Sequence, residues 1–122
     1  MKKLLLLLLL PILSFSQNNV PVKVIINLDQ YMSETSWDIQ DTAGNVVAAD
    51  GPYYNAVNYQ SLTIPVIIPE GPMVFTIYDS YGDGLAGALW GGLDGSYYVI
   101  QCNDTLVYGE IANFGLDTSH AF

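Results

Sequence analysis

The sequence contains no arginine, and its three lysines stand against twelve aspartates and glutamates, which gives a formal net charge of −9 over 122 residues. Proteins that bind nucleic acids use lysine and arginine side chains to neutralise phosphates. Recognition of phosphate or carboxylate groups relies on the same cationic side chains. The composition therefore argues against nucleic acid as a partner. So strong an acidic excess favours cations as bound ligands.

Cysteine and histidine each occur once, as Cys102 and His120. A lone cysteine makes no internal disulfide, so the fold must be held by its core or by bound ions. We expect Cys102 to be a buried structural thiol, with intermolecular pairing or a reactive thiol as the alternatives. One histidine and one cysteine do not make a structural zinc site, and a catalytic triad would depend on a histidine in the last short strand. We therefore predict a protein that is not an enzyme.

Long apolar runs are absent after the first sixteen residues. Met1–Lys3 is a short basic segment, Leu4–Leu13 is apolar, and Ser14–Ser16 offers small residues for cleavage. This order is typical of a secretory signal peptide, and the apolar run is shorter than the roughly 20 residues of a membrane-spanning helix. We expect residues 1–16 to be a signal peptide and residues 17–122 to be one secreted or cell-surface domain without a transmembrane segment. That domain holds one lysine against twelve acids, a balance of −11.

Helical periodicity is absent as well, and the dominant pattern has a period of two. Apolar and polar side chains alternate in short segments that are separated by turn residues. The expected strands cover residues 20–28, 36–40, 46–49, 62–68, 73–78, 96–102, 106–108 and 119–122. Pro65 cannot donate a hydrogen bond within a sheet, so its strand is expected at an edge or at an irregularity of the sheet. The sequence predicts an all-β fold, an antiparallel β-sandwich of jelly-roll or immunoglobulin-like type with about 7–8 strands in an order that the pattern does not reveal.

The segment Asp79–Gly84, which reads D-S-Y-G-D-G, directly follows one of these strands. Asp79 and Asp83 with glycines beside them allow a chain to fold around a hard cation, and Ca²⁺ takes 6–8 oxygen ligands. The segment is not an EF-hand loop, because Tyr81 and Trp90 stand where that loop needs an acidic ligand and a bidentate glutamate. A calcium site here therefore requires carboxylates from another part of the chain.

The polar loop at residues 28–37 offers such carboxylates, in Asp29 and Glu34. Loops at one end of a sandwich cluster, so this loop and the one that begins at Asp79 could share a site. We predict a Ca²⁺ site formed by Asp79, Asp83, Asp29 and Glu34. The alternative is that Asp79 and Asp83 only cap turns, as aspartate beside glycine often does.

Aromatic residues in two loops are candidates for ligand binding. Residues 82–95 hold six of the eleven glycines together with Trp90, which could stack on a sugar or simply cover the end of the sandwich. Tyr53, Tyr54 and Tyr59 lie among glycine, proline and asparagine residues, a mixture that suits carbohydrate or protein recognition. The other interpretation is that these tyrosines pack on the sheet surface.

Three ordered motifs together resemble a secreted β-sandwich module. They are D-x-Y-x-x-E-T-S-W at residues 29–37, F-T-I-x-D-S-Y-G-D-G at residues 75–84 and G-S-Y at residues 95–97. Similar modules occur in exported proteins of Bacteroidetes and other, often aquatic, organisms, frequently beside peptidases or surface domains. The resemblance implies an extracellular, calcium-stabilised accessory module without established catalytic activity. The chain departs from it by lacking the paired cysteines that such modules often carry.

The leading interpretation is a secreted, non-catalytic, calcium-stabilised module for adhesion or for binding an extracellular glycan or protein. A structural subunit of an extracellular assembly or filament, formed by self-association through strand edges or exposed tyrosines, is the alternative. A small hydrolase that uses two carboxylates is the third interpretation, and a sandwich of about a hundred residues offers little room for a deep cleft.

Overall fold

The computed structural model describes residues 18–122, so the predicted signal peptide at residues 1–16 lies outside the described part. The eight strands are β1 (Asn19–Asn27), β2 (Thr35–Asp41), β3 (Val46–Asp50), β4 (Ser61–Pro69), β5 (Met73–Asp79), β6 (Ser96–Gln101), β7 (Asp104–Tyr108) and β8 (Asp117–Ala121). Two short 3₁₀ turns, η1 (Met32–Glu34) and η2 (Gly87–Trp90), complete the elements. Within the described part no helix has the length and apolar character needed to cross a membrane.

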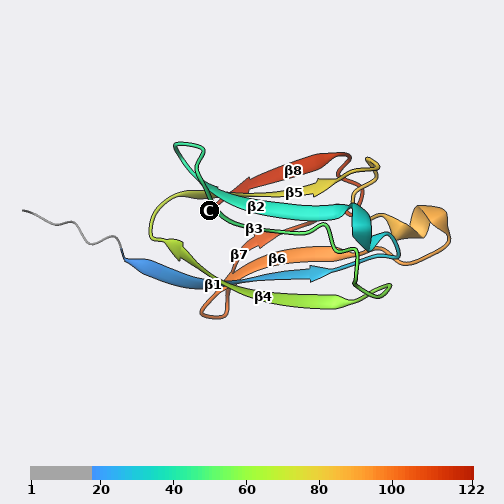
Figure 1. Ribbon diagram of the computed structural model, residues 1–122, viewed down its shortest axis with the longest axis horizontal. Coiled ribbons are helices and arrows are strands. Elements are labelled where there is room, and N and C mark those ends of the chain that lie inside the picture. Colours follow the sequence, from blue (N-terminus) through green and yellow to red (C-terminus); the bar gives the residue numbers. More distant parts are fainter. Residues whose placement is uncertain (1–17) are drawn as a thin grey trace, which may run out of the picture.

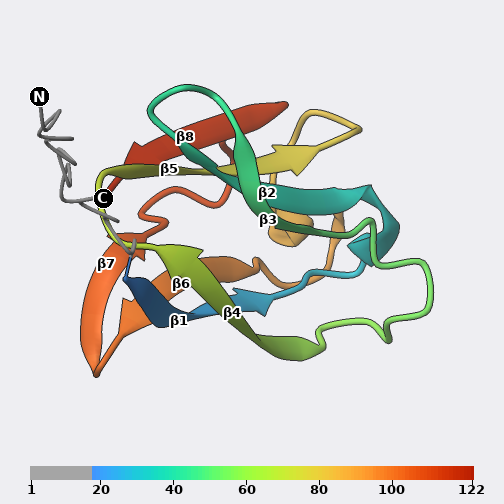
Figure 2. The ribbon, with the colours of Figure 1, turned by 60° about the vertical axis from the view of Figure 1, so that its left-hand side comes forward.

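The strands form two four-stranded antiparallel sheets, in the orders β4-β1-β6-β7 and β3-β2-β5-β8. The sheets lie face to face as two layers (Figures 1 and 2), which confirms the prediction of an antiparallel β-sandwich. Only the β2–β3 and β6–β7 connections join neighbours within one sheet, and every other connection passes from one sheet to the other. β4 lies at an edge, as the proline at position 65 predicts.

The core lies between the two sheets and is built by the period-two alternation. Val24 and Ile26 of β1 and Phe75 and Ile77 of β5 are fully buried, with Trp37 of β2 beside them. Removing each such side chain from water contributes about 1.5–3 kcal/mol. Because one face of every central strand is committed to this core, the register of the strands is fixed, and so is the position at which each loop begins.

Four loops gather at one end of the sandwich, at the right of Figure 1. They connect β1 to β2, β3 to β4, β5 to β6 and β7 to β8. Backbone hydrogen bonds join them: the Ser80 N–H donates to the Glu34 carbonyl (3.0 Å), and the Tyr59 N–H donates to the Asp29 carbonyl (3.1 Å). The expectation that the loop at 28–37 and the loop after Asp79 share one end is therefore confirmed.

Cys102 lies at the opposite end and is exposed, so the expectation of a buried thiol is wrong. β6 ends at Gln101, which pairs with Asp104, and the two residues between them form the hairpin turn. Cys102 (φ +48°) and Asn103 (φ +70°) both adopt positive φ, as a two-residue turn of type I′ requires. The thiol therefore projects from a turn, outside both sheets.

Candidate metal centre

Asp79 is the last residue of β5 and folds the loop that follows it. The buried Asp79 carboxylate accepts hydrogen bonds at Oδ2 from the N–H groups of Gly82, Asp83 (2.9 Å) and Gly84 (3.2 Å). Gly84 has a φ of +67°, and a Cβ there would lie 2.4 Å from the Ala112 carbonyl oxygen. The loop can therefore close over the carboxylate only with glycine at position 84.

Asp79 does cap a turn, but capping uses only one of its two oxygens. Within residues 18–122, Asp79 Oδ1 is buried and has no hydrogen-bond partner, and the same holds for Asp83 Oδ1. Asp83 Oδ2 accepts the indole N–H of Trp90. Asp79 is 2 % exposed and Asp83 is 7 % exposed. A buried polar group without a partner costs about 1–3 kcal/mol, and more when it is charged, so the two free oxygens require a partner that the described chain does not supply.

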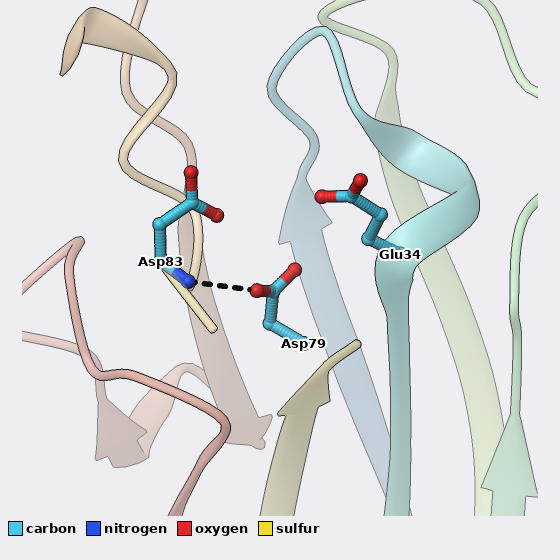
Figure 3. A group of neighbouring side chains, drawn as sticks. All are labelled: Glu34, Asp79 and Asp83. Carbon is cyan, nitrogen blue, oxygen red and sulfur yellow. Dashed lines mark hydrogen bonds between the residues drawn. The ribbon is translucent and has the colours of Figure 1, made fainter. Parts of the chain in front are cut away.

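Glu34 brings a third carboxylate to these oxygens from the β1–β2 loop. The ligand atoms of Glu34, Asp79 and Asp83, called the acidic cluster below, all lie within 4.8 Å of one another. Figure 3 shows the three side chains pointing into a common space between two loops. Calcium–oxygen distances are about 2.3–2.6 Å, so oxygens on one ion lie at most about 5 Å apart. The acidic cluster could therefore hold a metal ion.

Thr35 adds an uncharged oxygen next to the acidic cluster. It lies directly opposite Asp79 in the β2–β5 ladder and is 1 % exposed. Its Oγ1 is also buried without a hydrogen-bond partner in the described part of the chain. Side chains of paired residues stand on the same face of a sheet, so this hydroxyl faces the same region as the Asp79 carboxylate.

The acidic cluster has no positive side chain to balance it. Lys23, the only lysine or arginine in residues 18–122, lines a separate hollow with Pro21 and Ile67. Burial raises the pKa of Asp79, partly offset by its backbone N–H partners. Burial also raises the pKa of Glu34, and the negative charges of Asp79 and Asp83 raise it further. Ionising these carboxylates at neutral pH therefore costs free energy in the ion-free fold.

Asp29 lies beside the acidic cluster but is not one of the three residues whose oxygens converge. Its side chain is 1 % exposed, and its Oδ1 accepts the Tyr31 N–H at 2.7 Å. Burial raises the pKa of Asp29, and the charges of Asp83 and Asp79 add to the effect. The predicted set of four therefore divides into three converging carboxylates and one neighbour that adds negative charge.

Three aromatic side chains surround the open side of the acidic cluster. A hollow of about 180 Å³ is lined by Tyr31, Glu34, Tyr81, Asp83 and Trp90. The rings of Tyr81 and Trp90 meet edge to face with centroids 5.8 Å apart. Trp90 is one of the predicted ligand-binding residues, whereas the two tyrosines are not. The sequence feature that could have identified Tyr31 and Tyr81 is their position inside the D-x-Y-x-x-E and D-S-Y-G-D-G motifs.

The other predicted ligand-binding residues lie in the β3–β4 loop. The Tyr53 hydroxyl accepts the indole N–H of the buried Trp37 at 2.7 Å, and its ring packs against the core. Burial raises the pKa of Tyr53, so this tyrosine is engaged in the fold. Tyr54 and Tyr59 are 73 % and 44 % exposed, and neither lines the hollow that contains Trp90.

Comparisons with protein-family models, with curated proteins and with solved structures give no significant match to this chain. The resemblance to secreted β-sandwich modules therefore stays a prediction from three motifs. The chemistry of the acidic cluster and the hollow above it carries the functional argument.

Proposed function

We propose that this protein is a secreted, non-catalytic β-sandwich module that binds calcium through Glu34, Asp79 and Asp83 and uses the loops around the ion to bind a partner outside the cell. The observation that carries the proposal is the pair of buried, unpartnered oxygens, Asp79 Oδ1 and Asp83 Oδ1, which lie close to the Glu34 carboxylate. The motif resemblance and the predicted signal peptide support an extracellular role of this kind.

The donor atoms favour calcium over other ions. The acidic cluster offers only carboxylate oxygens, with a threonine hydroxyl nearby, and zinc sites use mainly cysteine and histidine. Magnesium demands nearly ideal octahedral geometry and retains several waters, whereas calcium accepts 6–8 oxygens in irregular arrangements supplied by loops. The ligands here come from two different loops, an arrangement that suits calcium.

Calcium would act by removing electrostatic repulsion. Three ionised carboxylates carry a charge of −3, and a divalent ion reduces it to −1. The ion also gives both free aspartate oxygens a partner and joins the β1–β2 loop to the loop after β5. An ion that binds only the folded chain stabilises it by about 2.7 kcal/mol at a free concentration of 100 times the dissociation constant.

Thermal unfolding of the purified protein in calcium and in chelator tests the proposal. We expect calcium to raise the Tm, and we expect Asp83→Asn to abolish this increase. The asparagine can still accept the Trp90 indole N–H, so the aromatic ring stays in place. Asp104→Asn, at an exposed position in β7, is the matched control and should keep the full response. An equal Tm in calcium and in chelator for the unmodified protein would refute the calcium site.

Self-association is favoured by one separate feature, the outer face of the β4-β1-β6-β7 sheet. A hollow of about 600 Å³ on this face is lined mainly by apolar side chains, among them Pro65, Ile67 and Ile100, and Ile67 is 69 % exposed. Apolar patches of this kind mark interaction sites in many proteins. A structural subunit should form larger species with rising concentration in sizing chromatography, whereas a binding module should remain monomeric.

A further inference from the structure

The hollow above the acidic cluster has aromatic walls that are exposed but held in place. Tyr31, Tyr81 and Trp90 are 39 %, 64 % and 53 % exposed. The Trp90 indole N–H is bonded to Asp83, and the Tyr81 ring packs against the Trp90 ring. The Tyr31 backbone N–H is bonded to Asp29, which holds its main chain beside the hollow. Two rings fixed by these contacts form a preorganised surface, which lowers the entropy cost of binding a ligand.

A calcium ion in the acidic cluster would have coordination positions open toward this hollow. Asp79 Oδ2 is engaged by three N–H groups and Asp83 Oδ2 by the Trp90 indole. Each aspartate therefore has one oxygen left for the ion, and Glu34 offers one or two, which gives three or four carboxylate oxygens. With the nearby Thr35 hydroxyl the side chains supply at most five oxygens, and calcium takes 6–8, so at least one position remains with six ligands and at least two with seven. Glu34 and Asp83 line the hollow, and oxygens of a ligand in the hollow could therefore reach the ion.

The charge around the hollow disfavours an anionic ligand. The acidic cluster with calcium retains a charge of −1, Asp29 adds to it, and residues 18–122 contain one lysine against twelve acids. Anionic ligands are repelled by this field. The ligand must nevertheless supply oxygen atoms to calcium and an apolar surface to the aromatic rings. Adjacent hydroxyl groups on a sugar ring meet both needs, because two oxygens can bind one ion while the C–H face packs on an aromatic ring.

We propose that the hollow lined by Tyr31, Tyr81 and Trp90 binds a neutral carbohydrate, whose adjacent hydroxyl groups complete the coordination of the calcium ion. This inference rests on the calcium site proposed above. The hollow, at about 180 Å³, is smaller than the roughly 300–1,000 Å³ of pockets for drug-sized ligands. It therefore accommodates a single sugar ring, such as the terminal residue of a glycan.

The test uses an array of immobilised glycans, some ending in neutral hexoses or fucose and others in glucuronate or sialic acid. The purified protein is applied in calcium and in chelator, and its calcium-dependent Tm is measured in parallel. We expect retention on one or more neutral glycans in calcium only. Tyr81→Ala should weaken this retention about five-fold, the loss of one aromatic contact, while leaving the calcium-dependent Tm increase unchanged. Tyr108→Ala, which removes a similarly exposed ring (52 %) on β7, should retain full binding.

The outcomes separate the inference from the function on which it rests. A normal calcium-dependent Tm with no retention on any neutral glycan would overturn the carbohydrate site and leave the calcium module standing. Retention that persists in chelator, or a preference for acidic glycans, would also overturn it. Equal losses in Tyr81→Ala and Tyr108→Ala would place binding elsewhere. The lack of any calcium-dependent Tm increase would instead refute the proposed function itself.

Discussion

Replacing Asp79 by asparagine should stabilise the ion-free protein and remove its response to calcium. Three backbone N–H groups converge on Asp79 Oδ2, so the amide oxygen of an asparagine must take that place. The amide NH₂ then occupies the position of Oδ1, which in the native side chain is buried without a partner. There it faces the Glu34 and Asp83 carboxylates, to which it can donate hydrogen bonds.

The magnitude follows from these contacts. A hydrogen bond to a charged group contributes about 1.5–3 kcal/mol, and the substitution also removes one of three neighbouring negative charges that repel one another. Because the three N–H groups at Oδ2 lose a charged acceptor, we take the low end of this range and expect the free energy of unfolding of the ion-free protein to rise by about 1.5 kcal/mol. For a domain of this size, this is an increase in Tm of about 6 °C.

Thermal unfolding followed by near-UV circular dichroism, with chelator and with calcium, measures both effects. The Asp79→Asn protein in chelator should unfold above the unmodified protein in chelator and should show the same Tm after calcium is added. Asp104→Asn, which replaces an exposed acid at the start of β7, controls for a general effect of lowering the net charge. If Asp79→Asn is less stable than the unmodified protein in chelator and still responds to calcium, the assignment of the free oxygen as a metal ligand is refuted.

Three further predictions concern pH, a glycine and a buried hydrogen bond. Burial raises the pKa of Glu34 and Asp79 above their ordinary values of 4.5 and 3.8, so the folded chain binds these protons more tightly than the unfolded chain does. The ion-free protein should therefore gain stability from these groups as the pH falls from 7 through the raised values, and the Tm increase caused by calcium should shrink over the same range. Gly84→Ala places a Cβ against a backbone carbonyl at positive φ, and it should lower the free energy of unfolding in urea by more than 2 kcal/mol. Gly44 also has positive φ but open surroundings, so Gly44→Ala should cost about half as much. Tyr53→Phe leaves the buried core indole N–H without its acceptor and should lower the free energy of unfolding by about 1–3 kcal/mol, measured in the same way.

The strands could be predicted from the sequence because each one satisfies a local rule. Alternation places Val22, Val24 and Ile26 on one face, and the proline at position 65 belongs to an edge strand. The strand order could not be predicted, because β1 pairs with β4 and β6, partners that are distant in the chain and share no local signal. The burial of Cys102 could not be predicted either, because a run of apolar and β-branched residues does not show at which residue the strand ends and the hairpin turn begins.

The acidic cluster could be predicted in part. The spacing of Asp79 and Asp83 around glycines indicated the loop, and the clustering of loops at one end of a sandwich indicated Glu34. Asp29 satisfied the same reasoning, but its Oδ1 is taken by the Tyr31 N–H, a local contact that the motif does not reveal. The aromatic walls of the hollow depend on how residues 80–95 fold beside Tyr31 of the β1–β2 loop, which only the three-dimensional structure shows.

The sequence left two interpretations of Asp79 open, a turn cap and a metal ligand, and the structure shows that one does not exclude the other. Oδ2 holds three N–H groups and thereby folds the loop, and this same fold buries Oδ1 beside Glu34 and Asp83. An asparagine could serve as a cap without placing a charge in this position. A carboxylate here strengthens the three N–H hydrogen bonds, but it also adds a buried negative charge that only a cation would neutralise. The second oxygen of Asp79 therefore gives an advantage over asparagine when an ion binds, as the proposed calcium site requires.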